Sequence, residues 1–321
     1  MRYRPLDVSR LQTTSLEERP SKVARTDSAR STRAGVSFVE WFDALPNILA
    51  GSSLRELVER TAQAIRRGRP VLLGMGGHVI KVGLAPVLCD LVRDGLVTAI
   101  LSNGSVTIHD VELALIGRTS EDVDASLVDG TFGMSGKTAD FILGAINREG
   151  PAAGIGRALG NALLAADAPF AETSILATCA REERPLCVAI AIGTDIVHAH
   201  PSADGAALGA AAMLDFRILC SIVSDLLDGG VYLNFGSAVV LPEIFLKAVS
   251  TSRNLGARGD FTTADFDFIR QYRPSTNVVR RPHIGTNGRG YSFTGHHELL
   301  FPLFWQAVRE SLRKGDEAPQ P

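Results

Sequence analysis

The sequence predicts an α/β protein built on a doubly wound, mostly parallel sheet. Short apolar runs that end at glycine alternate with longer amphipathic stretches, which is the pattern of buried strands separated by helices. The chain has 321 residues, of which 45% are hydrophobic, so it can bury a large core. We expect one domain from 36 to 313, with a flexible polar tail (1–35) before it and a frayed end (314–321) after it.

The expected elements follow one another at short spacing. A helix capped by Ser52 or Ser53 runs to about Arg67. Strands are expected at 70–73, 97–101, 186–192 and 231–235, and helices at 83–94, 107–116, 206–227, 241–254 and around Trp305. Because strands and helices alternate, the strands are expected to run parallel with helices on both faces.

Composition argues against several classes of function. A formal net charge of −2 provides no basic field for nucleic acid. No stretch approaches the roughly 20 uninterrupted apolar residues of a membrane span, and the N-terminus lacks an apolar signal core. The four cysteines are far apart and are expected to be reduced. We therefore expect a cytoplasmic protein that binds neither nucleic acid nor membrane.

The first candidate site is the glycine turn after the strand at 70–73. Glycine lets the backbone approach a ligand closely, and the free N–H groups of a following helix attract a pyrophosphate. Gly76, Gly77 and His78 are therefore candidates for binding a dinucleotide. The spacing is not GxGxxG, and a tight turn into a helix explains the glycines equally well.

The second candidate lies at the end of the next strand, at Ser102, Asn103 and Gly104. The carboxyl ends of neighbouring parallel strands open onto the same edge, so the two turns are expected to form one crevice. His109 is the first choice for a general base, because imidazole titrates near neutral pH. Asp110 is a candidate for binding the cofactor and for fixing the tautomer of a neighbouring imidazole, although an acidic residue is also favourable near a helix N-terminus.

The third candidate follows the strand that begins at 186 and contains Asp195, His198 and His200. In an extended chain the two histidines share one face, a spacing compatible with zinc. No third ligand accompanies them, which favours hydrogen bonding or substrate binding over a metal. Asp195 is the stronger candidate, for a ribose hydroxyl or an amine.

Two further turns complete the set of candidates. Gly236 and Ser237 lie between the strand at 231–235 and a helix. His296 and His297 precede the terminal amphipathic helix. Each is compatible with ordinary turn chemistry, but several such turns after parallel strands favour a binding edge.

The order of these motifs resembles the deoxyhypusine synthase family from about residue 66 to the C-terminus. The resemblance rests on the Ser-Asn-Gly turn at 102, the Thr194-Asp195 loop, the Gly-Ser-Ala-Val-Val turn at 236 and a late Leu-Phe-Pro-Leu. It implies a Rossmann-like fold, a homotetramer, and NAD bound at subunit interfaces for the oxidation of spermidine. By position, the residues that would line the cofactor are Gly76, Gly77, His78, Ser102, Asn103, Gly104 and Asp195, with His296 and His297 near the last cofactor-contacting segment.

The catalytic residues of that family are not retained. Leu241 occupies the position of the lysine that forms the family's covalent imine, and leucine cannot form one. His109 matches an acidic residue of the family. Lys81 is a candidate substitute for the lysine, whereas Lys247 would point away from the position of Leu241 on a helix. Deoxyhypusine synthesis itself is therefore not expected.

A shorter resemblance, over residues 95–115, connects the chain with the NAD-binding domain of ornithine cyclodeaminases of the lysine-oxoglutarate-reductase-related type. Both resemblances imply an NAD-dependent enzyme that acts on an amine or amino acid through an imine. NAD-dependent deamination, a non-catalytic dinucleotide-binding protein and a metal-dependent hydrolase on His198 and His200 are the alternatives.

Overall fold

The computed structural model describes residues 3–316, with side chains to 315, and the chain divides into two compact units. The first unit, Met1–Ser53, contains the short helix η1 (Arg25–Asp27) and α1 (Phe38–Ala44). Within it, Asn47 N donates to Asp27 O at 2.9 Å and Arg30 N donates to Ala44 O at 2.9 Å. Part of the segment predicted to be a tail therefore folds onto α1.

The second unit, Leu54–Pro321, is organised around one six-stranded sheet. The strands are β1 (Val71–Met75), β2 (Ala99–Asn103), β3 (Leu186–Ala189), β4 (Val231–Phe235), β5 (Thr262–Asp267) and β6 (Arg289–Thr294). They are all parallel and lie in the order β3-β2-β1-β4-β5-β6. This is the strand order of a Rossmann-like doubly wound fold, which confirms the predicted fold class and puts the change of winding direction between β1 and β4.

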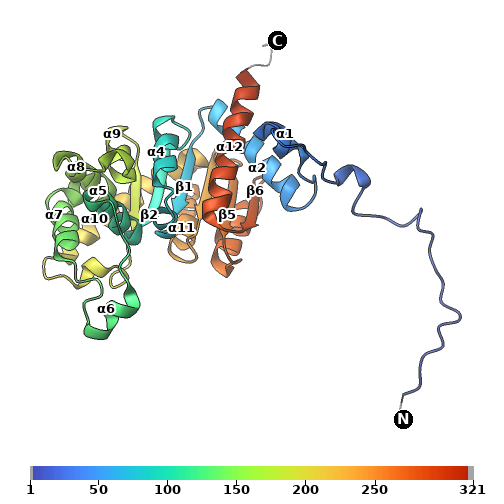
Figure 1. Cartoon of the computed structure of the whole chain (residues 1–321), viewed down its shortest axis with the longest axis horizontal. Helices are drawn as coiled ribbons and strands as arrows, with labels where there is room; N and C mark the ends of the chain where they lie inside the picture. The colour runs from blue at the N-terminus through green and yellow to red at the C-terminus, as the bar shows by residue number, and fades with distance from the viewer. Residues whose placement is uncertain (1–2, 317–321) are drawn as a thin grey trace. The chain divides into compact units, whose positions relative to one another are not determined.

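Helices cover both faces of the sheet (Figure 1). The α-helices are α2 (Ala50–Arg66), α3 (His78–Lys81), α4 (Ala85–Arg93), α5 (Gly104–Ile116), α6 (Val123–Asp129), α7 (Gly136–Ala153), α8 (Ile155–Ala165), α9 (Ile175–Arg181), α10 (Gly205–Leu226), α11 (Val240–Asn254) and α12 (His297–Asp316). Short helical turns are η2 (Ala171–Thr173), η3 (Ile196–Ala199), η4 (Pro274–Arg280) and η5 (Arg281–His283). On one face α10 and α11 pack on the strands, and α4, α5, α9 and α12 belong to the other.

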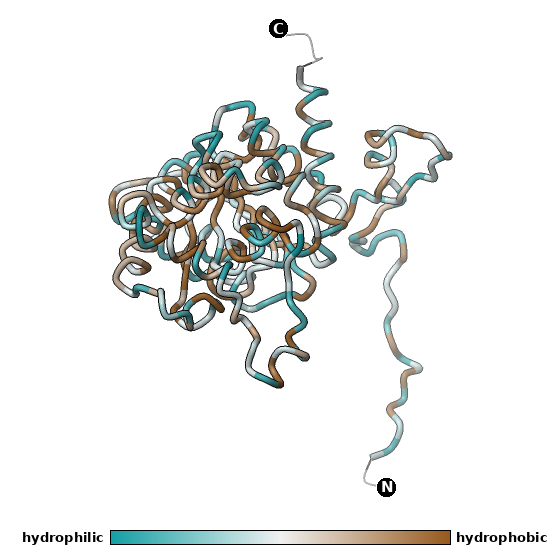
Figure 2. Tube along the Cα trace, turned by 60° about the vertical axis from the view of Figure 1, so that its left-hand side comes forward, coloured by the Kyte–Doolittle hydropathy of each residue, from teal (hydrophilic) through white to brown (hydrophobic). Residues whose placement is uncertain are grey.

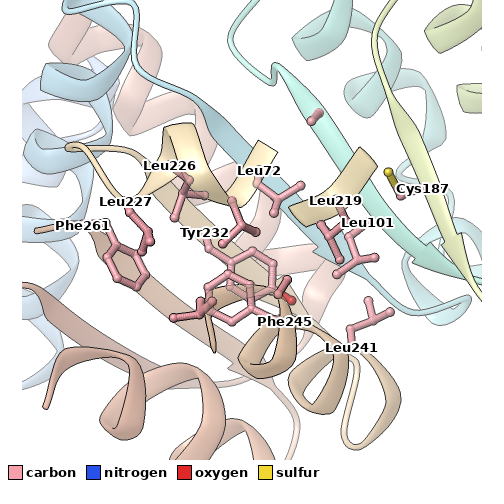
Figure 3. Close-up of a cluster of buried hydrophobic side chains, with 14 of the residues drawn as sticks. Leu72, Leu101, Cys187, Leu219, Leu226, Leu227, Tyr232, Leu241, Phe245 and Phe261 are labelled. Carbon is pink, nitrogen blue, oxygen red and sulfur yellow. The ribbon is translucent and has the colours of Figure 1, made fainter. Parts of the chain in front are cut away.

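The core between the sheet and the helices α10 and α11 is apolar and closely packed (Figures 2 and 3). Tyr232 of β4 stacks on Phe245 of α11 with ring centroids 3.9 Å apart. Leu241 is fully buried in the same cluster, which also contains Leu72 of β1 and Leu101 of β2. On the opposite face Phe235 stacks on Phe266 of β5, because successive residues of a strand point to opposite faces of the sheet.

The structure differs from the sequence-based expectation in several elements. Strands β5 and β6 were not predicted, and α5 begins at Gly104 rather than at 107. Residues 314–316, predicted to fray, continue α12, and the rest of that predicted end lies outside the described residues. The four cysteines carry no disulfide, and three of them are buried.

Helix α10 is long and apolar enough to cross a membrane, with a mean hydropathy of 1.8 over its most apolar window. It instead packs against β3, α7 and α11 within the fold. Its Asp215 is buried and accepts hydrogen bonds from Val188 N at 2.9 Å and Ile155 N at 3.1 Å. Only 33% of that apolar window is buried, so α10 packs on the fold along one side while much of its apolar surface stays accessible.

Candidate functional site

The turns after β1, β2 and β4 meet at the carboxyl edge of the sheet. A Cβ atom at Gly77 would lie 2.5 Å from Ser105 Oγ, and one at Gly76 would lie 2.6 Å from Gly236 O. A larger residue at Gly76 would therefore force the β1 and β4 turns apart, and one at Gly77 would displace the Ser105 side chain. The glycines of the first predicted turn are required by this close approach, and the three turns form one edge, as the sequence predicted.

A buried histidine lies beside the turn at the point where the winding direction changes. His297 is 0% exposed, its Nε2 donates to Phe266 O at 3.2 Å, and its Nδ1 has no hydrogen-bond partner in the described part of the chain. Burial lowers the pKa of His297, so the ring is neutral and Nδ1 carries a free lone pair. Gly236 has φ +67°, and a Cβ there would lie 2.4 Å from His297 Cε1.

The sequence analysis named both His296 and His297, and the structure gives the two side chains different environments. His296 is exposed and lies 3.7 Å from a Glu298 carboxylate oxygen, whereas His297 is enclosed among aromatic rings. The signal was present in the sequence: positions 297, 301, 304 and 308 form one apolar face of a helix. His78 is close to the same group, with its ring 5.6 Å from that of His297 and 4.8 Å from that of Phe268.

A cavity of about 200 Å³ opens next to these turns. Its polar lining includes the predicted candidates Lys81, His109 and Asp195. The other polar residues that line it are Ser105, Glu112, Ser120, Glu121 and Thr194. Apolar side chains complete the walls: Ile108, Val123, Phe132 and Ile196. The structure thus gathers residues from four segments that are far apart in the sequence.

The hydrogen bonds of His109 define its tautomer. Its Nδ1 lies 2.8 Å from Thr119 Oγ1, and that hydroxyl donates its only hydrogen to Glu112 Oε2 at 2.5 Å. Thr119 must therefore accept from an N–H on Nδ1, which leaves the lone pair on Nε2. Burial and the charge of Lys81 lower the pKa of His109, so the imidazole is neutral at pH 7.

The other edge of the imidazole faces the first glycine turn. A Cβ at Gly77 would lie 3.1 Å from His109 Cδ2, the atom next to Nε2. No described residue donates a hydrogen bond to Nε2. The free lone pair of His109 therefore lies between the predicted nucleotide turn and the cavity, where a general base would have to act.

Asp195 completes the cavity on the side of the β2 turn. A Cβ at Gly104 would lie 2.0 Å from Asp195 Oδ2, so only glycine fits there. His198 Nε2 lies 3.8 Å from the same oxygen, and its Nδ1 accepts from Gly193 N at 3.1 Å. Burial raises the pKa of Asp195, and the nearby His198 opposes that rise.

Two predicted candidates serve the fold instead of the site. Asp110 is 0% exposed, and its carboxylate accepts from Ser174 Oγ, Ile175 N and Leu176 N at the start of α9. It accepts hydrogen bonds from the free N–H groups at the start of α9, whose N-cap residue is Ser174, and so bonds to α9 rather than to an imidazole or the nucleotide turns. Ser237 is 6% exposed, and its hydroxyl accepts from Leu241 N at 3.3 Å.

Ser102 and Asn103 have different environments on β2. The hydroxyl of Ser102 is buried and lacks a hydrogen-bond partner among residues 3–316. Asn103 Oδ1 accepts from Ser105 Oγ at 2.9 Å, which closes the turn before α5. Ser105 and Thr119 were missed by the sequence analysis, and no local pattern distinguishes them from other surface hydroxyls.

His198 and His200, whose spacing in an extended chain is compatible with zinc, do not share a face. They lie on and just after η3 rather than in an extended chain, so His198 turns to Asp195 while His200 Nδ1 contacts Ser202 Oγ at 2.7 Å. His200 Nε2 lies 3.7 Å from Asp140 on α7. Within residues 3–316, no group of three or more His, Cys, Asp or Glu side chains is placed to hold a metal ion.

Neither Lys247 nor Lys81 places its amine where the resemblance would put the imine-forming lysine, at Leu241. Leu241 is buried in the core on the α11 side (Figure 3), and Lys247 pairs with Glu243 on the surface of the same helix. Lys81 lines the cavity from the end of α3. A lysine that acts in this cavity would therefore come from the first glycine turn.

The strand order and the edge described above define a class, the Rossmann-like doubly wound α/β proteins, which bind ligands where the winding changes. No protein-family model matches the sequence, and no curated protein sequence matches it. Solved structures do share the fold. Unliganded AgrE is 17% identical with a TM-score of 0.53, and the match covers 83% of this chain and 34% of AgrE.

A second AgrE structure, its ternary complex with ornithine and NAD⁺, is 16% identical with a TM-score of 0.52. The chain thus spans about a third of the length of AgrE. A putative deoxyhypusine synthase from Entamoeba histolytica is 11% identical with a TM-score of 0.52, over 88% of this chain and 96% of that one. The predicted resemblance to deoxyhypusine synthase is confirmed at the level of the fold.

Proposed function

We propose that the protein is an NAD-dependent enzyme that oxidises the carbon bearing an amine, in an amine or amino-acid substrate, to an imine. The observation that carries the proposal is the position of His109, whose free Nε2 lies between the β1 glycine turn and a cavity with charged walls. An AgrE structure with the same fold holds ornithine and NAD⁺, which supports both the cofactor and the substrate class.

The edge residues fit a dinucleotide. The turns at Gly76–His78, Ser102–Gly104 and Gly236 would hold it, because they lie together at the carboxyl edge of the sheet, where doubly wound folds bind their ligands. The unpartnered, buried Nδ1 of His297 offers an acceptor for a ligand N–H or O–H at the point where the winding changes. Bound NAD would supply the hydride acceptor for the reaction.

The cavity residues would bind the charged groups of the substrate and accept the proton that it loses. Conversion of CH–NH₃⁺ to C=NH₂⁺ releases one hydride and one proton. The amine must lose its proton before the carbon gives up hydride, and His109 Nε2 is placed to accept it. Asp195 would stabilise the cationic nitrogen, and Lys81 would pair with an anionic group such as a carboxylate.

A specific observation favours a second candidate, a dinucleotide-binding protein without this chemistry. The position of the family's imine-forming lysine is filled by Leu241, which is fully buried and packed in the core. An enzyme of the proposed type needs no covalent lysine, because hydride transfer and proton transfer complete the oxidation. Turnover therefore separates the two candidates.

The test combines calorimetric NAD titration with absorbance at 340 nm under single-turnover conditions with basic amino acids and polyamines. His297→Phe should weaken NAD binding about 5- to 30-fold through the loss of one buried hydrogen bond. The matched control His296→Phe changes an exposed neighbour and should bind normally. His109→Gln should bind NAD but form no NADH.

Each result has a definite meaning. Saturable NAD binding without any absorbance change would favour the non-catalytic candidate. Absence of NAD binding by the unmodified protein would refute both candidates.

A further inference from the structure

A segment between α5 and α7 forms one wall of the cavity. Residues 117–135, called here the cover segment, contain α6 and project from the body of the second unit (Figure 1). Ser120, Glu121, Val123 and Phe132 of this segment line the cavity, facing Asp195 and its neighbours on the opposite wall. The segment is therefore part of the site rather than an unrelated surface loop.

The carboxylate of Glu112 accepts hydrogen bonds near both ends of the cover segment. Glu112 Oε2 accepts from Thr119 Oγ1 at 2.5 Å, close to where the segment begins. Glu112 Oε1 accepts from Thr138 Oγ1 at 3.1 Å, just after the segment ends. Within the segment, Glu121 accepts from Gly133 N at 2.8 Å, which closes the loop on itself.

Thr119 also contacts the general base. Its hydroxyl accepts from His109 Nδ1 because its own hydrogen is given to Glu112. An isolated hydroxyl can rotate and donate instead of accept, so the Glu112 carboxylate decides the direction of the chain of hydrogen bonds. A displaced cover segment would remove Thr119 from both partners.

We propose that Glu112 is a positioning residue that acts through Thr119, holding His109 with its Nε2 lone pair free only while the cover segment is in place over the cavity. His109 then has the tautomer of a general base only when the cover segment lies against the cavity. The kinetic consequence rests on the proposed function, whereas the tautomer of His109 does not. A wrong tautomer at a catalytic imidazole reduces kcat strongly even when the geometry is preserved.

The experiment is ¹H–¹⁵N NMR of histidine-labelled full-length protein at pH 8, with the His109 signals identified by their loss in His109→Gln. The unmodified protein should show the Nδ1–H tautomer. Thr119→Val, which removes the hydroxyl at nearly equal volume, should shift His109 toward Nε2–H. Thr119→Ser should restore the original pattern, and Glu112→Leu should behave like Thr119→Val.

Thr138→Val is the matched control. It releases the other end of the cover segment without touching His109, so the tautomer should be kept while amide hydrogen exchange in residues 118–134 becomes faster. In turnover assays Thr119→Val should lower kcat on the order of 100-fold, and Thr119→Ser should recover most of it.

Two outcomes would overturn the inference: Nε2–H on His109 in the unmodified protein, or an unchanged tautomer in Thr119→Val. The expected NMR pattern in a protein that shows no turnover would instead refute the proposed oxidation and leave the positioning role of Glu112 supported.

Discussion

The substitution Asp110→Asn is expected to destabilise the fold and to leave NAD binding unchanged. The carboxylate of Asp110 is fully buried and receives three hydrogen bonds, from Ser174 Oγ at 2.6 Å, Ile175 N at 2.9 Å and Leu176 N at 3.0 Å. Asparagine supplies one acceptor oxygen and replaces the other with an NH₂ group. That group would face a backbone N–H at the start of α9.

The expected magnitude follows from these contacts. One buried N–H left without a partner costs about 1–3 kcal/mol, and the remaining bonds lose the contribution of an ionised acceptor. Burial raises the pKa of Asp110, so the neutral amide recovers part of the desolvation cost. We therefore expect the free energy of unfolding to fall by about 2–3 kcal/mol.

Urea unfolding followed by circular dichroism measures this change. The control is Asp90→Asn, the same substitution at an exposed carboxylate that pairs with Arg93 at 3.0 Å, where the change should stay within about 0.5 kcal/mol. Equal effects of the two substitutions would refute the role of Asp110 in bonding to the start of α9. Normal stability with weakened NAD binding would restore the cofactor role that the sequence suggested for Asp110.

Two more predictions concern buried positions near the sheet. Leu241→Lys, which introduces the lysine of the deoxyhypusine synthases, should lower the free energy of unfolding by several kcal/mol because it buries an unpaired charge, whereas Leu241→Met should cost less than about 1.5 kcal/mol. A Lys variant with an unchanged urea midpoint would contradict this. Burial raises the pKa of Asp265 to about 7, so the folded state keeps a proton that the unfolded state loses above about pH 4. Stability contributed by this group is present below pH 4 and is lost as the pH rises to about 7, by at most about 4 kcal/mol. Asp265→Asn should make the pH dependence of stability shallower without abolishing it, because burial raises the pKa of Asp215 to about 7 as well. Urea titrations from pH 4 to 8 that show the same slope in both proteins would exclude this assignment.

Local sequence was sufficient for the first four strands and for the edge of the sheet. Apolar runs such as 71–75 and 231–235 can only be buried, and their glycine turns mark where the chain reverses into a helix. Strand β5 was missed because Thr262, Thr263, Asp265 and Asp267 make it polar. Its burial depends on partners from elsewhere, such as Asn234 Nδ2, which donates to Asp265 Oδ1 at 2.8 Å.

The sequence by itself therefore determined the fold class and the turns that carry Gly76, Gly104 and Gly236, because hydrophobic periodicity and glycine act within a few residues. Only the tertiary structure decided which polar groups work together. Asp110 and His109 are neighbours on one helix, yet one accepts hydrogen bonds from α9 while the other lines the cavity. Helical rotation points adjacent side chains in different directions, and what each meets there comes from segments brought together by the sheet.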